Sequence, residues 1–292
     1  MDKETMQQFI LEALSKKLGD GFQCSIQQVL KTNQKLDGLT ILQKGECISP
    51  TIYLEPFYKA LEDGAAPNDV IDGILLSYFQ FCGKKQMPFD ARSVMDFGQI
   101  KDRLYVVLIN RHRNTELLQD IPHSLFLDDF AATIRCLVNV TGDGISSFLV
   151  HNSHLGLWGT GPETLLRLAV PNTRRLFGLE LKAMQDVLAE LNPFHTGGSF
   201  HVPIWIMTNR KNAHGAATAL FDDVLKDFAK THGSFYVVFS SVHELLLIPE
   251  TGGIDIGSVT EINREVNASE VREEEILGTR AYYYSSEKGF IL

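Results

Sequence analysis

The sequence predicts an α+β protein in which a mixed sheet flanked by helices forms a larger C-terminal lobe, preceded by a smaller α/β lobe. Two kinds of pattern support this class. Apolar residues recur at helical spacing in residues 6–18 and 70–79. Short runs rich in β-forming residues, such as 105–109, lie between such stretches. Helix and strand patterns then alternate through the second half of the chain.

The N-terminal lobe is expected to contain two helices and a β-hairpin. Glycines follow the apolar stripe of residues 6–18, where a helix would end. Residues 22–26 and 39–41 alternate between apolar and polar side chains, and the polar stretch 32–34 suits the turn between them. The stripe at 70–79 predicts the second helix.

The C-terminal lobe is expected to begin near residues 120–123, which gives lobes of residues 1–120 and 121–292 or one continuous domain. Thr160 and Glu163 have the spacing of a capping box and predict a helix that starts there. The remaining patterns predict strands at 130–140, 202–208, 234–240, 245–248 and 281–284, and helices at 221–230 and 258–266.

Composition limits the classes of function. The chain has 292 residues and a formal net charge of -9, a sign that repels phosphate backbones, so nucleic acid is not expected as a partner. No apolar run is long enough to span a bilayer, and the N-terminus lacks the pattern of a signal peptide. The four cysteines form no CxxC pair and are expected to be free thiols in a reducing compartment. These features predict a cytoplasmic protein.

Recognised catalytic and cofactor motifs are absent from the sequence. There is no glycine fingerprint for nucleotides, no nucleophile elbow, no kinase motif set and no EF-hand loop. We therefore expect no cofactor. Active sites are often assembled from distant residues, so the absence of motifs leaves catalysis open.

The first candidate site is the loop that contains Arg111, Arg113 and Asn114. Asn114 is placed to cap a short helix at 115–119, and two guanidinium groups beside exposed backbone amides would bind an anion such as phosphate. The alternative is a solvated loop whose arginines pair with Glu116 and Asp120.

His151 and His154 form the second candidate. At a spacing of three residues they would share a helix face and could ligate a metal with His195 or His201. No glutamate lies between them as in HExxH, and apolar residues surround them. Hydrogen-bonded structural histidines are the favoured interpretation, and no metal is expected.

The third candidate combines Ser241, His243 and Glu244 with Asn209. On a strand, His243 and Glu244 point to opposite faces, and Ser241 and His243 are about 7 Å apart, too far for a hydrogen bond. We expect these side chains to cap backbone groups of a turn. If the strands that precede Asn209 and follow Ser241 are neighbours, a pocket between the two loops is the best geometric candidate, and two polar turns at a sheet edge are the alternative.

Several short segments carry a family resemblance. They are 50–54 with Tyr58, 100–103 with Asn110 and Asn114, 121–123 with 126–128, Thr208 and Asn209 with Gly215 and Ala216, and Ser240 and Ser241 with His243 and Glu244. Over most of its length the chain resembles an uncharacterised family of unknown function from anaerobic gut bacteria. The later segments are also similar, more distantly, to a second bacterial family of unknown function. Phe239 stands where a proline is expected. The resemblance implies a bacterial cytoplasmic setting and no activity.

The sequence therefore favours a non-enzymatic cytoplasmic binding or regulatory protein of bacteria that has a protein partner. The alternative is a hydrolase that acts on a phosphate-containing or small polar substrate. That alternative requires Arg111, Arg113, Asn209, His243 and Glu244 to converge in one deep pocket.

Overall fold

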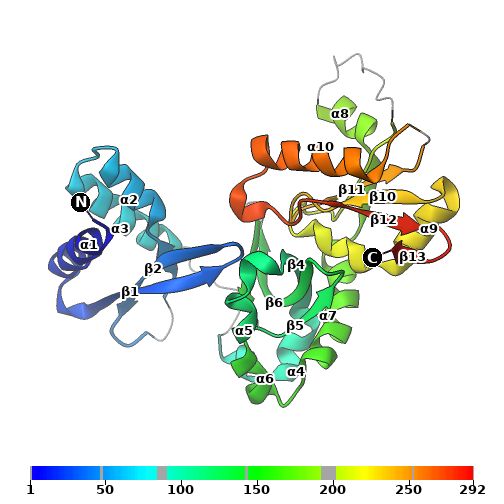
Figure 1. Cartoon of the computed structure of the whole chain (residues 1–292). Helices are drawn as coiled ribbons and strands as arrows, with labels where there is room; N and C mark the ends of the chain where they lie inside the picture. Colours follow the sequence, from blue (N-terminus) through cyan, green and yellow to red (C-terminus); the bar gives the residue numbers. More distant parts are fainter. Residues whose placement is uncertain are drawn as a thin grey trace. The chain divides into compact units, whose positions relative to one another are not determined.

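The computed structural model describes residues 2–46, 49–83, 91–141, 144–191, 202–251 and 253–291. The chain divides into two compact units, Met1–Met87 and Pro88–Leu292 (Figure 1). The boundary expected at residues 120 and 121 falls inside the second unit, because the strand before it pairs with a strand after it. The α+β class is confirmed.

The first unit packs helices against a three-stranded antiparallel sheet of order β1-β2-β3. Asp2 caps the first helix by accepting a hydrogen bond from the Thr5 backbone N–H (2.8 Å). Asn33 has a positive φ of 60° in the tight turn of the β1-β2 hairpin. The elements are α1 (Lys3–Leu18), β1 (Phe22–Lys31), β2 (Gln34–Gln43), β3 (Thr51–Tyr53), α2 (Glu55–Glu62) and α3 (Pro67–Gly83).

The first half of the second unit is built on a four-stranded antiparallel sheet. Its long strand β6 (Phe130–Thr141) pairs with β4 (Leu104–Asn110), with β5 (His123–Phe126) and with β7 (Gly144–Leu149). Short helical segments and the long helix α7 connect and cover these strands. They are η2 (Ala91–Met95), α4 (Phe97–Ile100), η3 (Lys101–Arg103), η4 (His112–Asn114), α5 (Leu117–Asp120), α6 (Asn152–Trp158) and α7 (Pro162–Phe177).

The second half is a six-stranded sheet of order β13-β12-β10-β11-β9-β8. Its strands are β8 (Glu180–Ala183), β9 (Trp205–Thr208), β10 (Phe235–Val238), β11 (Leu245–Pro249), β12 (Ala281–Ser285) and β13 (Gly289–Ile291). The helical segments are α8 (Met184–Leu191), η5 (Gly215–Leu220), α9 (Asp222–His232), α10 (Ile256–Ser269) and η6 (Glu273–Glu275).

All pairs in this sheet are antiparallel, which differs from the expected mixed sheet. The helix α9 joins β9 to β10, and α10 joins β11 to β12, so each helix connects strands that run in the same direction. In the sheet, β11 lies between β9 and β10, and β10 lies between β11 and β12. The strands that a helix connects are therefore parallel to each other but not adjacent, and each adjacent pair is antiparallel.

The two faces of the six-stranded sheet belong to different hydrophobic clusters. Phe235 and Val237 face the large core of the unit, which includes Phe228 of α9. Tyr236 and Val238 face the opposite way and pack with Val259 of α10. The period-two alternation of β10 thus buries both faces. In Figure 1, α10 lies along one side of β10, β11 and β12.

The helix α7 begins differently from the sequence prediction. Its N-cap is Gly161, without a side-chain capping bond, and Pro162 occupies the first turn. Thr160 therefore precedes the cap position, and the expected capping box with Glu163 does not form. At the start of α6, the backbone N–H of His151 donates to His154 Nδ1 (2.9 Å), which is the return bond of a capping box.

Candidate functional site

Ser241, His243 and Glu244 lie in the connection between β10 and β11. The backbone N–H of His243 donates to Ser241 Oγ (3.0 Å), and Ser241 Oγ donates to Glu244 Oε1 (2.7 Å). The hydroxyl is thus used inside the turn. Within the described part of the chain, no hydrogen bond joins Ser241 Oγ to the His243 ring.

The Asn209 loop meets this turn, because β9 and β11 are paired neighbours. Thr208 Oγ1 donates to the backbone oxygen of His243 (2.7 Å). Asn209 is buried and closes its own loop, with Nδ2 donating to Ala213 O (2.8 Å) and Oδ1 accepting from the Lys211 N–H (2.9 Å). Gly215 lies so close that a Cβ there would be 2.2 Å from both His243 O and Thr208 Oγ1. The two loops form a tightly packed junction.

Both nitrogens of the His243 ring have polar neighbours. Nδ1 accepts a hydrogen bond from the His214 backbone N–H (3.3 Å), so the proton of the neutral ring lies on Nε2. Nε2 is 3.2 Å from Glu275 Oε1, and Glu275 also pairs with Arg272. Burial would raise the pKa of Glu275, but the hydrogen bonds from Arg272 and His243 lower it, so this carboxylate stays ionised.

His214 lies beside His243, with ring centroids 6.1 Å apart. Burial, and to a lesser degree the charges of Arg135 and His243, lower the pKa of His214 to about 3. The ring is therefore neutral at pH 7. Its Nδ1 is buried and has no hydrogen-bond partner among the described residues.

The arginine loop is held by contacts that the sequence did not indicate. Arg113 pairs with Glu273 (2.7 Å), and Arg111 donates to Asp128 O (3.4 Å). Asn114 Nδ2 donates back to Asn110 O (2.7 Å), whereas α5 has no side-chain cap at its N-terminus. The predicted capping role of Asn114 is therefore wrong.

The segment η6 links the two candidate loops. Arg113 contacts its first residue, Glu273, and His243 contacts its last, Glu275. Next to it, Asn110 Nδ2 donates to Leu277 O (2.8 Å). Residues of η6 thus contact both the arginine loop and the turn that contains His243.

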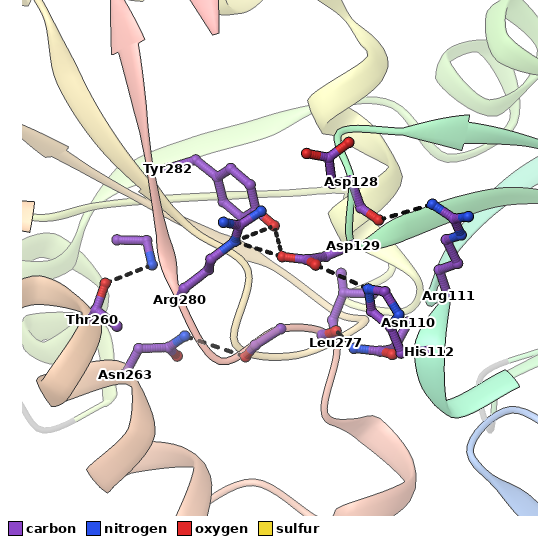
Figure 2. Close-up of polar contacts among 12 residues, drawn as sticks. Asn110, Arg111, His112, Asp128, Asp129, Thr260, Asn263, Leu277, Arg280 and Tyr282 are labelled. Atoms are coloured by element: carbon purple, nitrogen blue, oxygen red, sulfur yellow. Dashed lines mark hydrogen bonds and ion pairs between the residues drawn. The ribbon is translucent and has the colours of Figure 1, made fainter. Parts of the chain in front are cut away.

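Asp129 is the centre of a network that sequence reasoning missed (Figure 2). Its carboxylate accepts hydrogen bonds from Arg280 Nε (2.6 Å) and from the Tyr282 hydroxyl, and it lies 3.1 Å from His112 Nε2. Burial would raise the pKa of Asp129, but these hydrogen bonds lower it below the ordinary value. Burial and the neighbouring carboxylate raise the pKa of Tyr282. Asp129 thereby ties the start of β6 to β12.

His151 and His154 use their ring nitrogens within the fold. His151 Nδ1 is 2.7 Å from Asp120 Oδ2, and His154 Nδ1 accepts from the His151 N–H (2.9 Å). Burial lowers the pKa of His154, whose ring stacks on Trp158 at 5.1 Å. His195 and His201 lie outside the described residues. Across the described part of the chain, no group of three potential ligands could hold a metal.

A basic depression of about 580 Å³ lies at the C-terminal end of α7. It is lined by residues 174–179, which include Arg174 and Arg175, and by Arg210 and Lys211 from the loop after β9. Arg174 pairs with Asp223 (2.6 Å). Arg175 donates to Asp102 O and to Asn172 Oδ1 (3.2 Å), both uncharged acceptors.

Arg210 is fixed beside the end of α7 although its side chain is exposed. Its backbone N–H donates to Phe177 O (3.1 Å). Gly178 has a φ of 71°, a conformation that favours glycine. A Cβ at this position would lie 3.0 Å from Arg210 Cδ, so the absence of a side chain allows Arg210 to lie against the backbone. Among the described residues, no carboxylate forms an ion pair with Arg210 or Lys211.

Comparisons with known proteins place the chain in a family. Searches of curated proteins and of solved structures gave no match. None of the helices in the described ranges has the length and apolar character needed to cross a bilayer. The model of a family of unknown function, DUF5688, matches residues 3–286. The chain therefore belongs to the DUF5688 family.

Proposed function

We propose that this protein is a non-enzymatic binding protein that holds a phosphate-bearing ligand in the basic depression. The observation that carries the proposal is the convergence of four cationic side chains from two segments on one depression, in a chain with a net charge of -9. Its volume of about 580 Å³ lies in the range of small-molecule pockets, about 300 to 1,000 Å³.

The charge balance inside the depression supports an anionic ligand. Of the four cations, only Arg174 has a carboxylate partner among the described residues. Arg175 is oriented by two neutral oxygens and keeps its charge uncompensated. Planar guanidinium groups that are held in place bind phosphate oxygens in pairs. The side chain of Arg210 lies against Gly178, and its backbone N–H is bonded to Phe177 O, so its guanidinium group starts from a defined position at the end of α7.

The geometry at His243 supports the non-enzymatic part of the proposal. A general base needs a free ring nitrogen within reach of the proton it removes. Both nitrogens of His243 face protein groups, and the Ser241 hydroxyl is committed to Glu244. These residues stabilise the junction between two loops.

Calorimetric titration with inorganic pyrophosphate tests the binding site. We expect the wild type to bind, and the double substitution Arg210→Ser with Lys211→Ser to weaken binding by at least about tenfold, or about 1.4 kcal/mol. Arg264→Ser with Lys288→Ser removes the same charge away from the depression and should leave the affinity almost unchanged. Equal losses in both double variants, or no binding by the wild type, would refute the proposal.

A phosphate-release assay separates binding from hydrolysis. Purified protein incubated with pyrophosphate or p-nitrophenyl phosphate should release no more phosphate than the His243→Ala variant does. Turnover that disappears in His243→Ala would instead identify the hydrolase alternative.

We further propose a bacterial cytoplasmic setting with a protein partner. The free thiols of Cys24, Cys82 and Cys136 support a reducing compartment. Cell fractionation tests the location, and affinity capture of the full-length chain from its native host tests the partner. Recovery of the protein from the oxidising exterior of the cell would contradict the cytoplasmic location. A clean monomer under every condition would contradict the protein partner.

A further inference from the structure

The four cations of the basic depression stand on two separate supports. Arg174 and Arg175 lie in the last turn of α7, whereas Arg210 and Lys211 follow β9. Residues 176–179 complete the lining. A ligand that contacts both supports therefore joins two segments that are distant in the sequence.

The first support presents one cation that is oriented and uncompensated. Arg175 donates to Asp102 O and to Asn172 Oδ1 (3.2 Å), and both acceptors are neutral. These two bonds use only one of its terminal nitrogens, and a guanidinium group has five N–H donors, so Arg175 keeps donors for a ligand. Arg174 instead pairs with Asp223 (2.6 Å).

The second support is a turn that is built around the buried side chain of Asn209. Asn209 Oδ1 accepts from the Lys211 N–H (2.9 Å), and Nδ2 donates to Ala213 O (2.8 Å). The Arg210 N–H donates to Phe177 O (3.1 Å), which ties the turn to the end of α7. The backbone that carries both cations is therefore ordered without a ligand, which lowers the cost of binding one.

Acceptors near the depression are already engaged. Free carbonyl oxygens at the C-terminal end of a helix repel anions. At the end of α7, Arg174 O accepts from the Gly178 N–H (2.8 Å), and Phe177 O accepts from the turn described above. Glu180 follows the lining and pairs with Lys182 (2.9 Å). These bonds reduce the repulsion that an anion would meet here.

Three lining cations have no carboxylate partner in the described ranges, namely Arg175, Arg210 and Lys211. One phosphoryl group carries about 1.5 to 2 negative charges at pH 7, so a single phosphate leaves at least one of the three unbalanced. Two linked phosphoryl groups balance all three and provide one group for each support. A depression of about 580 Å³ has room for more than one such group.

We propose that the ligand of this depression carries at least two linked phosphoryl groups, one held by Arg175 and the other by Arg210 and Lys211. This inference rests on the proposed function and narrows its ligand to diphosphates and longer phosphate chains. A monophosphate engages only one support, and the turn with two cations is the stronger of the two. The role of Arg175 therefore separates the two classes of ligand.

Calorimetric titrations with orthophosphate and with pyrophosphate, at one pH and ionic strength, test the ligand class. We expect the wild type to bind pyrophosphate at least about tenfold more tightly than orthophosphate, because only pyrophosphate contacts both supports. Arg175→Gln removes the charge and keeps an N–H donor for Asp102 O. It should weaken pyrophosphate binding at least about tenfold and orthophosphate binding less than about threefold.

Two further variants complete the test. Lys211→Gln changes an exposed side chain of the other support and should weaken the binding of both ions. Arg264→Gln removes the same charge from α10, outside the lining, and should leave both affinities unchanged. Equal affinity of the wild type for the two ions, or equal losses of both in Arg175→Gln, would overturn the two-group ligand. The phosphate site itself would still stand if Lys211→Gln weakened the binding of both ions, and it would fall with this inference if the wild type bound neither.

Discussion

His214 combines a buried neutral ring with a left-handed backbone (φ 56°). Burial, with Arg135 and His243, lowers its pKa to about 3, whereas an unfolded histidine titrates near about 6.5. As the pH falls below that value the unfolded state takes up the proton first. The contribution of His214 to the free energy of unfolding is therefore complete above about pH 6.5 and falls by up to about 1.4 kcal/mol per pH unit toward pH 3.

His214→Asn should reduce this slope, because asparagine tolerates the left-handed backbone and does not titrate. Urea unfolding at pH 7.5 and at pH 5.5 measures the change in the free energy of unfolding with pH. Most carboxylates stay ionised over this range, so they contribute little to the change. Thr231→Asn, which changes no titratable group, is the control, and it should keep the slope of the wild type. Identical slopes in the wild type and in His214→Asn would contradict the buried neutral ring.

Gly215 sits at the contact between the two polar loops. A Cβ at this position would lie 2.2 Å from His243 O and 2.2 Å from Thr208 Oγ1, and a backbone oxygen cannot move aside without breaking the junction. Gly215→Ala should therefore lower the free energy of unfolding by about 3 kcal/mol or more. Chemical denaturation measures the change.

The matched control is Gly156→Ala in α6, where nothing lies within 4 Å of the added Cβ. Alanine favours a helix interior by up to about 1 kcal/mol, so this variant should be as stable as the wild type or more so. Equal destabilisation by the two substitutions would mean that crowding at Gly215 is not the cause.

At the scale of elements, Asp129 connects β6 of one sheet with β12 of the other. Asp129→Asn removes the charge that Arg280 and Tyr282 contact, and should cost about 2 kcal/mol at pH 7. Because hydrogen bonds lower the pKa of Asp129, its contribution is present above about pH 4 and is lost as the pH falls through the folded-state pKa. The variant should lose less stability than the wild type on acidification.

A double-mutant cycle with Tyr282→Phe isolates the contact, and we expect a coupling of at least about 0.5 kcal/mol. Tyr283 on the same strand bonds to Glu250 instead, so a cycle with Tyr283→Phe should give additive effects. Additivity in the Tyr282 cycle would show that Asp129 acts independently of β12.

Elements with a strong local pattern were predictable from the sequence, whereas contacts between distant segments were not. The stripe of α1 and the alternation of the β1-β2 hairpin are local, and both elements form where expected. In the six-stranded sheet, another strand lies between the two strands that each helix connects. No local pattern in the sequence indicates this strand order. Arg280 and Asp129 are 151 residues apart in the chain.

The candidate sites follow the same division. The turn role of Ser241 could be inferred from strand geometry, because extended backbone separates it from the His243 ring. The basic depression draws on two segments, 174–179 and 210–211, and only the fold brings them together. The pairing of Arg113 with Glu273 likewise joins residues 160 positions apart.

At the scale of the whole molecule, each unit has its own hydrophobic core. The buried cluster of the first unit runs from Met6 to Tyr78, and the described members of the large cluster in the second unit begin at Ile100. Ile10 and Leu108 are both fully buried, one in each core. Two separate cores predict two cooperative transitions on heating.

Calorimetry of the full chain with one core substitution at a time tests this independence. Truncating a buried aliphatic side chain to alanine costs about 2 to 5 kcal/mol, enough to lower a melting temperature by roughly 5 °C or more. Ile10→Ala should lower one transition and leave the other in place, and Leu108→Ala should do the reverse. A single transition that both substitutions lower would mean that the two cores unfold as one cooperative body, because destabilising either core would then destabilise the whole chain.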